Sequence, residues 1–138
     1  MIDYSAALKE VGLRATLQRI GILEMIERAG HSSIDDVYAM TQRSLPHLSL
    51  ATIYKNILMM TQRDLLVEVP IVGKKSKYEI KKANHIHLIC EKCADVEDEM
   101  LDIISEETLL LLTQKSSFSF SKPQITLYGI CKKCQNSS

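Results

Sequence analysis

Apolar side chains recur every three or four residues in four segments of the first half of the chain, and this spacing predicts amphipathic α-helices. The predicted segments run from Asp3 to Val11, from Thr16 to Gly30, from Ser33 to Leu45 and from Leu50 to Arg63. Thr16 and Ser49 are typical helix-capping residues, and Ser33 with Asp36 resembles a capping box. The side chains expected to face the core include Leu17, Ile20, Leu23, Ile26, Leu50, Ile53, Ile57 and Met60.

Two short β-like runs follow the fourth helical segment, at Leu65–Pro70 and Lys77–Ile80, and a loop with several lysines joins them. Helices followed by a hairpin with a basic loop are typical of a winged helix-turn-helix, in which the helix before the wing enters the major groove of DNA. Candidate contacts to phosphates or base edges on this helix and loop are Thr52, Lys55, Asn56, Lys74 and Lys75. The same residues also fit a solvated helix face and a solvated loop, so the pattern alone leaves both interpretations open.

The second half of the chain has three strand-like runs and one helical run. The strands are predicted at Ile86–Cys90, Asp95–Glu97 and Gln124–Ile130, and the helix at Leu101–Gln114. These elements leave one face of such a small unit uncovered, which favours dimerisation. A polar join at Lys81–Ala83 separates the halves, so we expect an α+β chain with a winged-helix DNA-binding domain at 1–82 and a small α/β dimerisation and metal-binding domain at 83–138.

Length and composition agree with a globular protein of one or two small domains. The chain has 138 residues, of which 46% are hydrophobic and 25% charged, and its apolar runs are too short to cross a membrane. The N-terminus lacks the features of a secretory signal, so we expect a cytoplasmic protein. The net charge is zero, but residues 1–82 carry an excess of basic side chains and residues 83–138 an excess of acidic ones, which suggests that the two halves have different partners.

All four cysteines lie in the second half, as Cys90-x-x-Cys93 and Cys131-x-x-Cys134. In a reducing compartment two such turns indicate a zinc site rather than disulfides, because each turn directs two thiolates at one centre and Zn²⁺ prefers four tetrahedral ligands. A closed shell of four sulfurs leaves no position for water, so the zinc is expected to be structural. A redox role, or four unpaired thiols, is the alternative interpretation.

A second candidate metal site begins at the segment His85-Ile86-His87. Side chains two apart on a strand lie on the same face, so both imidazoles can bind one metal ion. Carboxylates are available at Glu79 and in the run Glu97–Glu99, and a mixed nitrogen and oxygen site suits Fe²⁺, Mn²⁺ or a second Zn²⁺. Because Glu79 belongs to the first domain, a metal bound by these groups would fix the angle between the two domains.

Four motifs carry a resemblance to a known family over nearly the whole chain. They are Leu13–Arg19 (LRATLQR), Ser49–Asn56 (SLATIYKN), His85–Cys93 (HIHLICEKC) and Tyr128–Cys134 (YGICKKC). Together they are similar to the motifs of the ferric uptake regulator (Fur) family of bacterial metal-dependent repressors. The resemblance implies a homodimer of winged helices that binds a palindromic DNA operator when metal is present, with structural zinc on the four cysteines.

The resemblance also implies the residues of a regulatory site and of the DNA contact. The expected ligands of a regulatory Fe²⁺ or Mn²⁺ are His31, Glu79, His85, His87 and Asp98. The expected DNA contacts are Arg14, Arg19, Thr52, Tyr54, Lys55, Asn56, Lys74 and Lys75. On pattern alone His31 would be a surface or cap residue and Tyr54 a core residue.

Within the family, the chain most resembles the peroxide repressor (PerR) branch. Iron-sensing members usually carry an extra histidine-rich site, whose expected positions here hold Asn84, Ile86 and Pro123. Peroxide repressors share this simpler pattern and the aspartate at position 98, but they usually have Asp where this chain has Glu79. We therefore expect a repressor that senses peroxide through Fe²⁺-catalysed oxidation of His31 or His85, with an iron-responsive repressor as the alternative.

Two further classes of function fit the sequence less well. A zinc-ribbon protein interaction module would need the cysteines but neither the histidine pair nor Glu79. An enzyme is not expected, because the chain has no nucleophile motif and no glycine-rich phosphate loop, and contains only five glycines.

Overall fold

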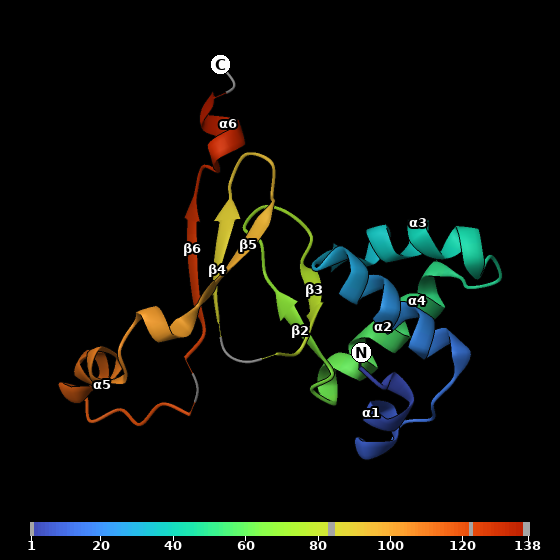
Figure 1. The fold of residues 1–138 in the computed structure, drawn as a ribbon, viewed down its shortest axis with the longest axis horizontal. Helices are drawn as coiled ribbons and strands as arrows, with labels where there is room; N and C mark the ends of the chain where they lie inside the picture. Colours follow the sequence, from blue (N-terminus) through green and yellow to red (C-terminus); the bar gives the residue numbers. More distant parts are fainter. Residues whose placement is uncertain (1, 83–84, 122, 137–138) are drawn as a thin grey trace. The chain divides into compact units, whose positions relative to one another are not determined.

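The chain divides into two compact units, Met1–Lys81 and Lys82–Ser138. The computed structural model, shown in Figure 1, describes residues 2–82, 85–121 and 123–136. The boundary expected from the sequence lies one residue from this division, and Ala83 itself falls outside the described residues. Within the described residues, no helix has the length and apolar character needed to cross a lipid bilayer.

Helices form most of the first unit. In chain order its elements are α1 (Tyr4–Glu10), α2 (Leu17–Ala29), β1 (Ser32–Ser33), α3 (Ile34–Ser44), α4 (Leu50–Gln62), β2 (Leu66–Val69) and β3 (Lys77–Ile80). The hydroxyl oxygen of Thr16 accepts the backbone N–H of Arg19, and that of Ser49 accepts the backbone N–H of Thr52, both at 3.2 Å. Ser33 and Asp36 form the predicted capping box, with both hydrogen bonds at 3.1 Å. These caps confirm the predicted helix starts.

The core of the first unit lies among α2, α3 and α4. Its fully buried side chains include Ile22, Leu23, Ile26, Val37, Ile53, Ile57 and Met60. Leu17 and Leu50, which the periodicity places in the core, are instead 82% and 43% exposed. Both are the first residues of their helices, and helical side chains point toward the N-terminus. Each therefore projects past the end of its helix instead of covering a preceding turn.

A small antiparallel sheet completes the first unit, with the strands in the order β1-β3-β2. The pairing of β2 with β3 forms the predicted hairpin, in which Leu66 lies opposite Ile80. β1 pairs with β3 through Ser32, which lies opposite Tyr78. The sequence does not predict β1, because two serines show no apolar alternation. The helices and the hairpin together form the winged helix-turn-helix expected for this half of the chain.

The second unit is built around a three-stranded sheet. Its elements are β4 (His85–Cys90), β5 (Val96–Met100), a 3₁₀ turn (Leu101–Ile103), α5 (Glu106–Gln114), β6 (Ile125–Gly129) and α6 (Lys132–Asn136). β4 is the central strand, antiparallel to β5 and parallel to β6. β5 begins one residue later than predicted and continues to Met100, and the sequence does not predict the short helix α6.

The helix predicted over Leu101–Gln114 is wrong in its first part. Ile104 has an extended backbone, with φ −98° and ψ 119°. Ser105 then caps a new helix, because its Oγ accepts the backbone N–H of Thr108 at 3.2 Å. Apolar side chains keep a helical spacing across this break, so periodicity alone joins the turn and the helix into one element.

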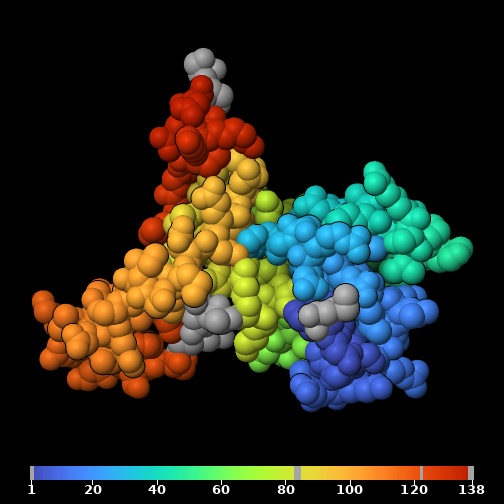
Figure 2. All heavy atoms as spheres, in the orientation of Figure 1, coloured from blue at the N-terminus to red at the C-terminus, as the bar shows by residue number. Residues whose placement is uncertain are grey.

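Helix α5 stands apart from the sheet of its own unit (Figures 1 and 2), and none of its residues is buried. Leu110, Leu111 and Leu112 are 53%, 66% and 75% exposed. Leu127 on β6 is also 58% exposed. Exposed leucines in a group are a feature of surfaces that contact other molecules.

Candidate metal centres and DNA-binding face

The four cysteines meet at one end of the sheet in the second unit. Cys90 ends β4 and Cys93 lies in the turn after it, while Cys131 immediately precedes α6 and Cys134 lies within α6. Their sulfur atoms all lie within 4.8 Å of one another, with Cys93 Sγ and Cys131 Sγ 3.8 Å apart. In a tetrahedron with Zn–S bonds of about 2.3 Å, two sulfurs are separated by about 3.8 Å, so the arrangement fits a zinc ion.

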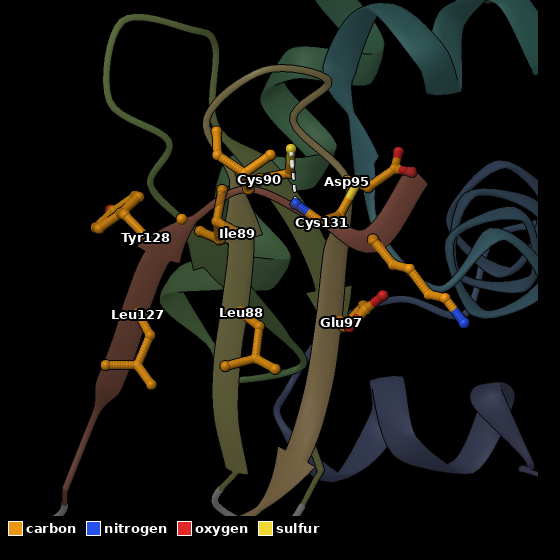
Figure 3. Close-up of a pocket in the computed structure, with 11 residues that line it drawn as sticks. Leu88, Ile89, Cys90, Asp95, Glu97, Leu127, Tyr128 and Cys131 are labelled. Atoms are coloured by element: carbon orange, nitrogen blue, oxygen red, sulfur yellow. Dashed lines mark hydrogen bonds between the residues drawn. The ribbon is translucent and has the colours of Figure 1, made fainter. Parts of the chain in front are cut away.

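Two backbone amides donate hydrogen bonds to the sulfur of Cys90. The N–H groups of Cys131 and Cys93 donate to Cys90 Sγ at 3.4 Å and 3.5 Å, the first of which is the dashed line in Figure 3. These hydrogen bonds lower the pKa of the Cys90 thiol to about 6, whereas a hydrogen bond with Cys131 and burial raise the pKa of Cys134 to about 12. If all four cysteines were deprotonated, the thiolates would repel one another, and the charge of a bound Zn²⁺ would offset that repulsion.

His31 and Glu79 form a pair within the first unit. The chain turns at Gly30, where φ is +84°, and then enters β1, whose pairing with β3 brings His31 beside Glu79. The Nε2 atom of His31 lies 2.7 Å from Oε2 of Glu79. The Glu79 side chain is buried, and a buried carboxylate needs a compensating partner or cation. The pair therefore offers one nitrogen and one carboxylate to a metal ion.

The second unit holds a group of two imidazoles and one carboxylate. His85 and His87 alternate along β4, and their Nε2 atoms are 2.9 Å apart. Asp98 on β5 lies opposite His87, and its Oδ1 lies 3.5 Å and 3.7 Å from Nε2 of His85 and His87. Nitrogen and oxygen donors that converge in this way suit Fe²⁺ or Mn²⁺. Lys82 Nζ also forms an ion pair with Oδ2 of Asp98 at 2.5 Å. The sequence does not predict this pair, because nothing distinguishes Lys82 from the other lysines of its polar segment.

The pairing of β4 with β5 selects one acid from the run at 97–99. Asp98 lies opposite His87 and is half-buried, whereas Glu97 and Glu99 are exposed. The five predicted ligands thus fall into two groups, His31 with Glu79 in the first unit and the other three in the second. At the positions of the extra histidine-rich site, Ile86 is buried and apolar, and Asn84 lies outside the described residues.

The predicted DNA contacts differ in how accessible they are. Arg14, Lys55 and Lys74 are exposed, and Tyr54 is 50% exposed, in contrast to the core position that its pattern suggests. Lys75 is paired with Asp35 on α3 at 2.6 Å. Three of the predicted contacts are half-buried: Arg19, Thr52 and Asn56. The exposed face of α4 therefore carries Tyr54 and Lys55.

Comparison with known proteins gives one consistent result. The model of the ferric uptake regulator family matches residues 10–128. The chain is 30% identical over 128 residues to the peroxide operon regulator of Bacillus subtilis (strain 168), and the match covers 92% of this chain and 88% of that protein. The crystal structure of the Campylobacter jejuni peroxide stress regulator has a TM-score of 0.76 and 32% identity, and the match covers 96% of this chain and 100% of that one. The crystal structure of the Vibrio cholerae ferric uptake regulator has a TM-score of 0.80 and 28% identity, and the match covers 94% of this chain and 100% of that one.

Proposed function

Since this chain belongs to the ferric uptake regulator family, whose members are transcriptional regulators and not enzymes, we propose that it is a homodimeric repressor whose DNA binding depends on a regulatory metal ion. The observation that carries the proposal is the convergence of His85, His87 and Asp98 within the second unit. A bare zinc ribbon needs no such group. The cysteine cluster serves as a separate, structural zinc site.

The regulatory site takes one Fe²⁺ or Mn²⁺ and uses ligands from both units. His31 and Glu79 supply two donors, and His85, His87 and Asp98 supply three. Neither group alone fills the coordination shell of these metals, which prefer about six ligands. An ion that needs both groups binds only conformations that bring them together, and it shifts the population toward those conformations by its differential affinity. The crystal structure of the Vibrio cholerae ferric uptake regulator reveals a structural rearrangement of that protein's DNA-binding domains, which supports such movement in the family.

The exposed residues of α4 read the DNA, and the second unit forms the dimer. Tyr54 and Lys55 lie on the exposed side of the helix that precedes the wing, the position of a recognition helix. The exposed leucines of α5 and Leu127 supply an apolar dimer surface. A dimer with twofold symmetry presents two recognition helices to two half-sites, which fits a palindromic operator.

The inducing signal that we propose is hydrogen peroxide. The Bacillus subtilis and Campylobacter jejuni relatives are named for peroxide regulation, and they support this branch of the family. When bound, Fe²⁺ would supply one electron for cleavage of the O–O bond and would regain one electron as the ring is oxidised, so the iron is unchanged in the net reaction. In the net reaction, the imidazole of His31 or His85 gains one oxygen atom from hydrogen peroxide and water is released. The oxidised ring is a poorer ligand, so metal affinity and DNA binding fall together.

One experiment separates peroxide sensing from iron sensing. A DNA duplex enriched by the wild-type protein from a random-sequence pool is titrated with protein carrying Fe²⁺ or Mn²⁺, with and without peroxide. Peroxide should abolish binding only with Fe²⁺, and mass spectrometry should find one added oxygen on His31 or His85. If binding requires Fe²⁺ or Mn²⁺ but neither histidine is oxidised, the iron-responsive alternative, which Glu79 favours, is supported instead.

A further inference from the structure

Arg19, in the first turn of α2, uses its guanidinium for three contacts inside the first unit. Its Nε donates to Oδ1 of Asn56 at 3.0 Å, and one Nη donates to the backbone carbonyl of Arg14 at 2.9 Å. The other Nη contacts Sδ of Met59 at 3.4 Å. Asn56 and Met59 both belong to α4, so a single side chain joins α2, and the loop before it, to the helix that carries Tyr54 and Lys55.

Asn56 extends this connection into the backbone of α4. Its Nδ2 donates to the carbonyl of Thr52 at 3.0 Å, one turn earlier in the same helix. The bonds therefore run from the Arg14 carbonyl through Arg19 and Asn56 to the backbone of α4. A planar guanidinium can reach several acceptors at once in a fixed geometry, whereas a lysine ammonium on a flexible stem does not reproduce that geometry.

We propose that Arg19 and Asn56 are positioning residues for DNA recognition, which fix the rotation of α4 against α2 and do not themselves contact DNA. The inference rests on the proposed function, because it assumes that α4 reads DNA. It changes the role expected from the sequence, where both residues are candidate DNA contacts. Recognition side chains must be held within a fraction of an ångström of their binding geometry. Loss of such a support should therefore weaken binding to the preferred sequence more than binding to other sequences.

Salt dependence distinguishes a positioning residue from a phosphate contact. The logarithm of affinity falls with the logarithm of salt concentration, with a slope of about 0.9 for each phosphate neutralised. Loss of a phosphate contact reduces that slope, whereas loss of an internal support lowers the affinity for the preferred sequence and leaves the slope unchanged. A lysine at position 19 keeps the charge, so it retains a phosphate contact but not the hydrogen bonds to Asn56 and Arg14.

The test measures binding of Mn²⁺-loaded protein to the enriched duplex and to a scrambled duplex over a range of salt concentrations. Arg19→Lys and Asn56→Ala should each weaken binding to the enriched duplex roughly tenfold, with unchanged salt slope and unchanged binding to the scrambled duplex. The double variant should bind no worse than the weaker single variant, because both substitutions break one connection. Lys55→Ala is the matched control on the exposed face of the same helix and should reduce the slope.

Three results would overturn the inference: wild-type affinity in Arg19→Lys, a slope reduced by about 0.9 in Arg19→Gln, or additive losses in the double variant. Thermal melting of each variant shows whether it is folded, and Asn56→Ala supplies the test if the Arg19 variants are not. A wild-type protein that binds no DNA would refute the proposed function as well. A wild-type protein that binds the enriched duplex no more tightly than Arg19→Lys does would refute this inference alone.

Discussion

The Nε2 atom of His31 lies 2.7 Å from Oε2 of Glu79, although the two residues are far apart in the sequence. The pairing of β1 with β3 produces this contact, because Ser32, next to His31, lies opposite Tyr78, next to Glu79. Glu79 is only 1% exposed, so its carboxylate is fixed by the packing around it. The pairing of β1 with β3 therefore places two ligands of the proposed regulatory site side by side in the first unit.

Replacement of Glu79 tests this part of the site. Glu79→Gln keeps the shape of the side chain and removes its charge, so the affinity for Mn²⁺ measured by isothermal titration calorimetry should fall at least about tenfold. Glu68→Gln is the matched control, since the carboxylate of Glu68 accepts the hydroxyl of Tyr78 at 3.2 Å on the same sheet. The control should bind Mn²⁺ like the wild type. Equal affinities in all three proteins would exclude Glu79 as a ligand.

The zinc site should determine whether the second unit folds. Structural zinc in small peptides contributes about 10 kcal/mol or more, which rivals the total stability of a small domain. Cys93→Ser should therefore lose the tightly bound zinc, and circular dichroism should show loss of the sheet that contains β4. Removal of zinc from the wild type with a chelator should have the same effect. A variant that keeps its zinc and its melting temperature would show that the cysteines have another role.

The exposed leucines of α5 should hold the dimer together. Leu111 is 66% exposed, and Leu111→Glu would bury a charge in an apolar interface, so sedimentation should show a shift from dimer to monomer. Leu17→Glu is the control, because Leu17 is 82% exposed in the first unit and lies outside this surface. A Leu111→Glu protein that sediments as a dimer would place the interface elsewhere.

Alkaline stability depends on a tyrosine of the sheet in the first unit. Burial and the carboxylate of Glu68 raise the pKa of Tyr78 to about 12, whereas an unfolded tyrosine ionises near pH 10. The unfolded chain loses this proton first, so its contribution to stability is complete below about pH 10 and is lost as the pH rises toward 12. In urea denaturation of Tyr78→Phe, the free energy of unfolding should decline less steeply with pH over this range. Tyr128→Phe is the control and should decline as the wild type does. A decline in Tyr78→Phe as steep as that of the wild type would contradict the assignment.

Local rules predict much of this fold, and their failures have physical causes. The caps at Ser33 and Ser49 are predictable because their hydrogen bonds act within one helical turn. The break at Ser105 is missed, since the spacing of apolar side chains continues across it. The strand β1 is missed because Ser32 and Ser33 become a strand only through their pairing with β3, which is distant in the sequence.

The candidate sites divide in the same way. Spacing alone predicts the cysteine cluster and the pair His85 and His87, because the donors of each C-x-x-C motif and of the histidine pair lie within three residues of one another. It does not choose Asp98 from three adjacent acids, since that choice depends on the register of β4 and β5. His31 enters only through the family resemblance, because its contact with Glu79 depends on the tertiary fold.

The central claim is that one exchangeable metal ion takes ligands from both units, and a crystal structure of the Mn²⁺-saturated protein tests it most directly. Anomalous scattering at the manganese edge would locate the ion without ambiguity. The account predicts a single exchangeable ion per chain, bound by His31 and Glu79 together with His85, His87 and Asp98. An ion bound only by residues of one unit would contradict it.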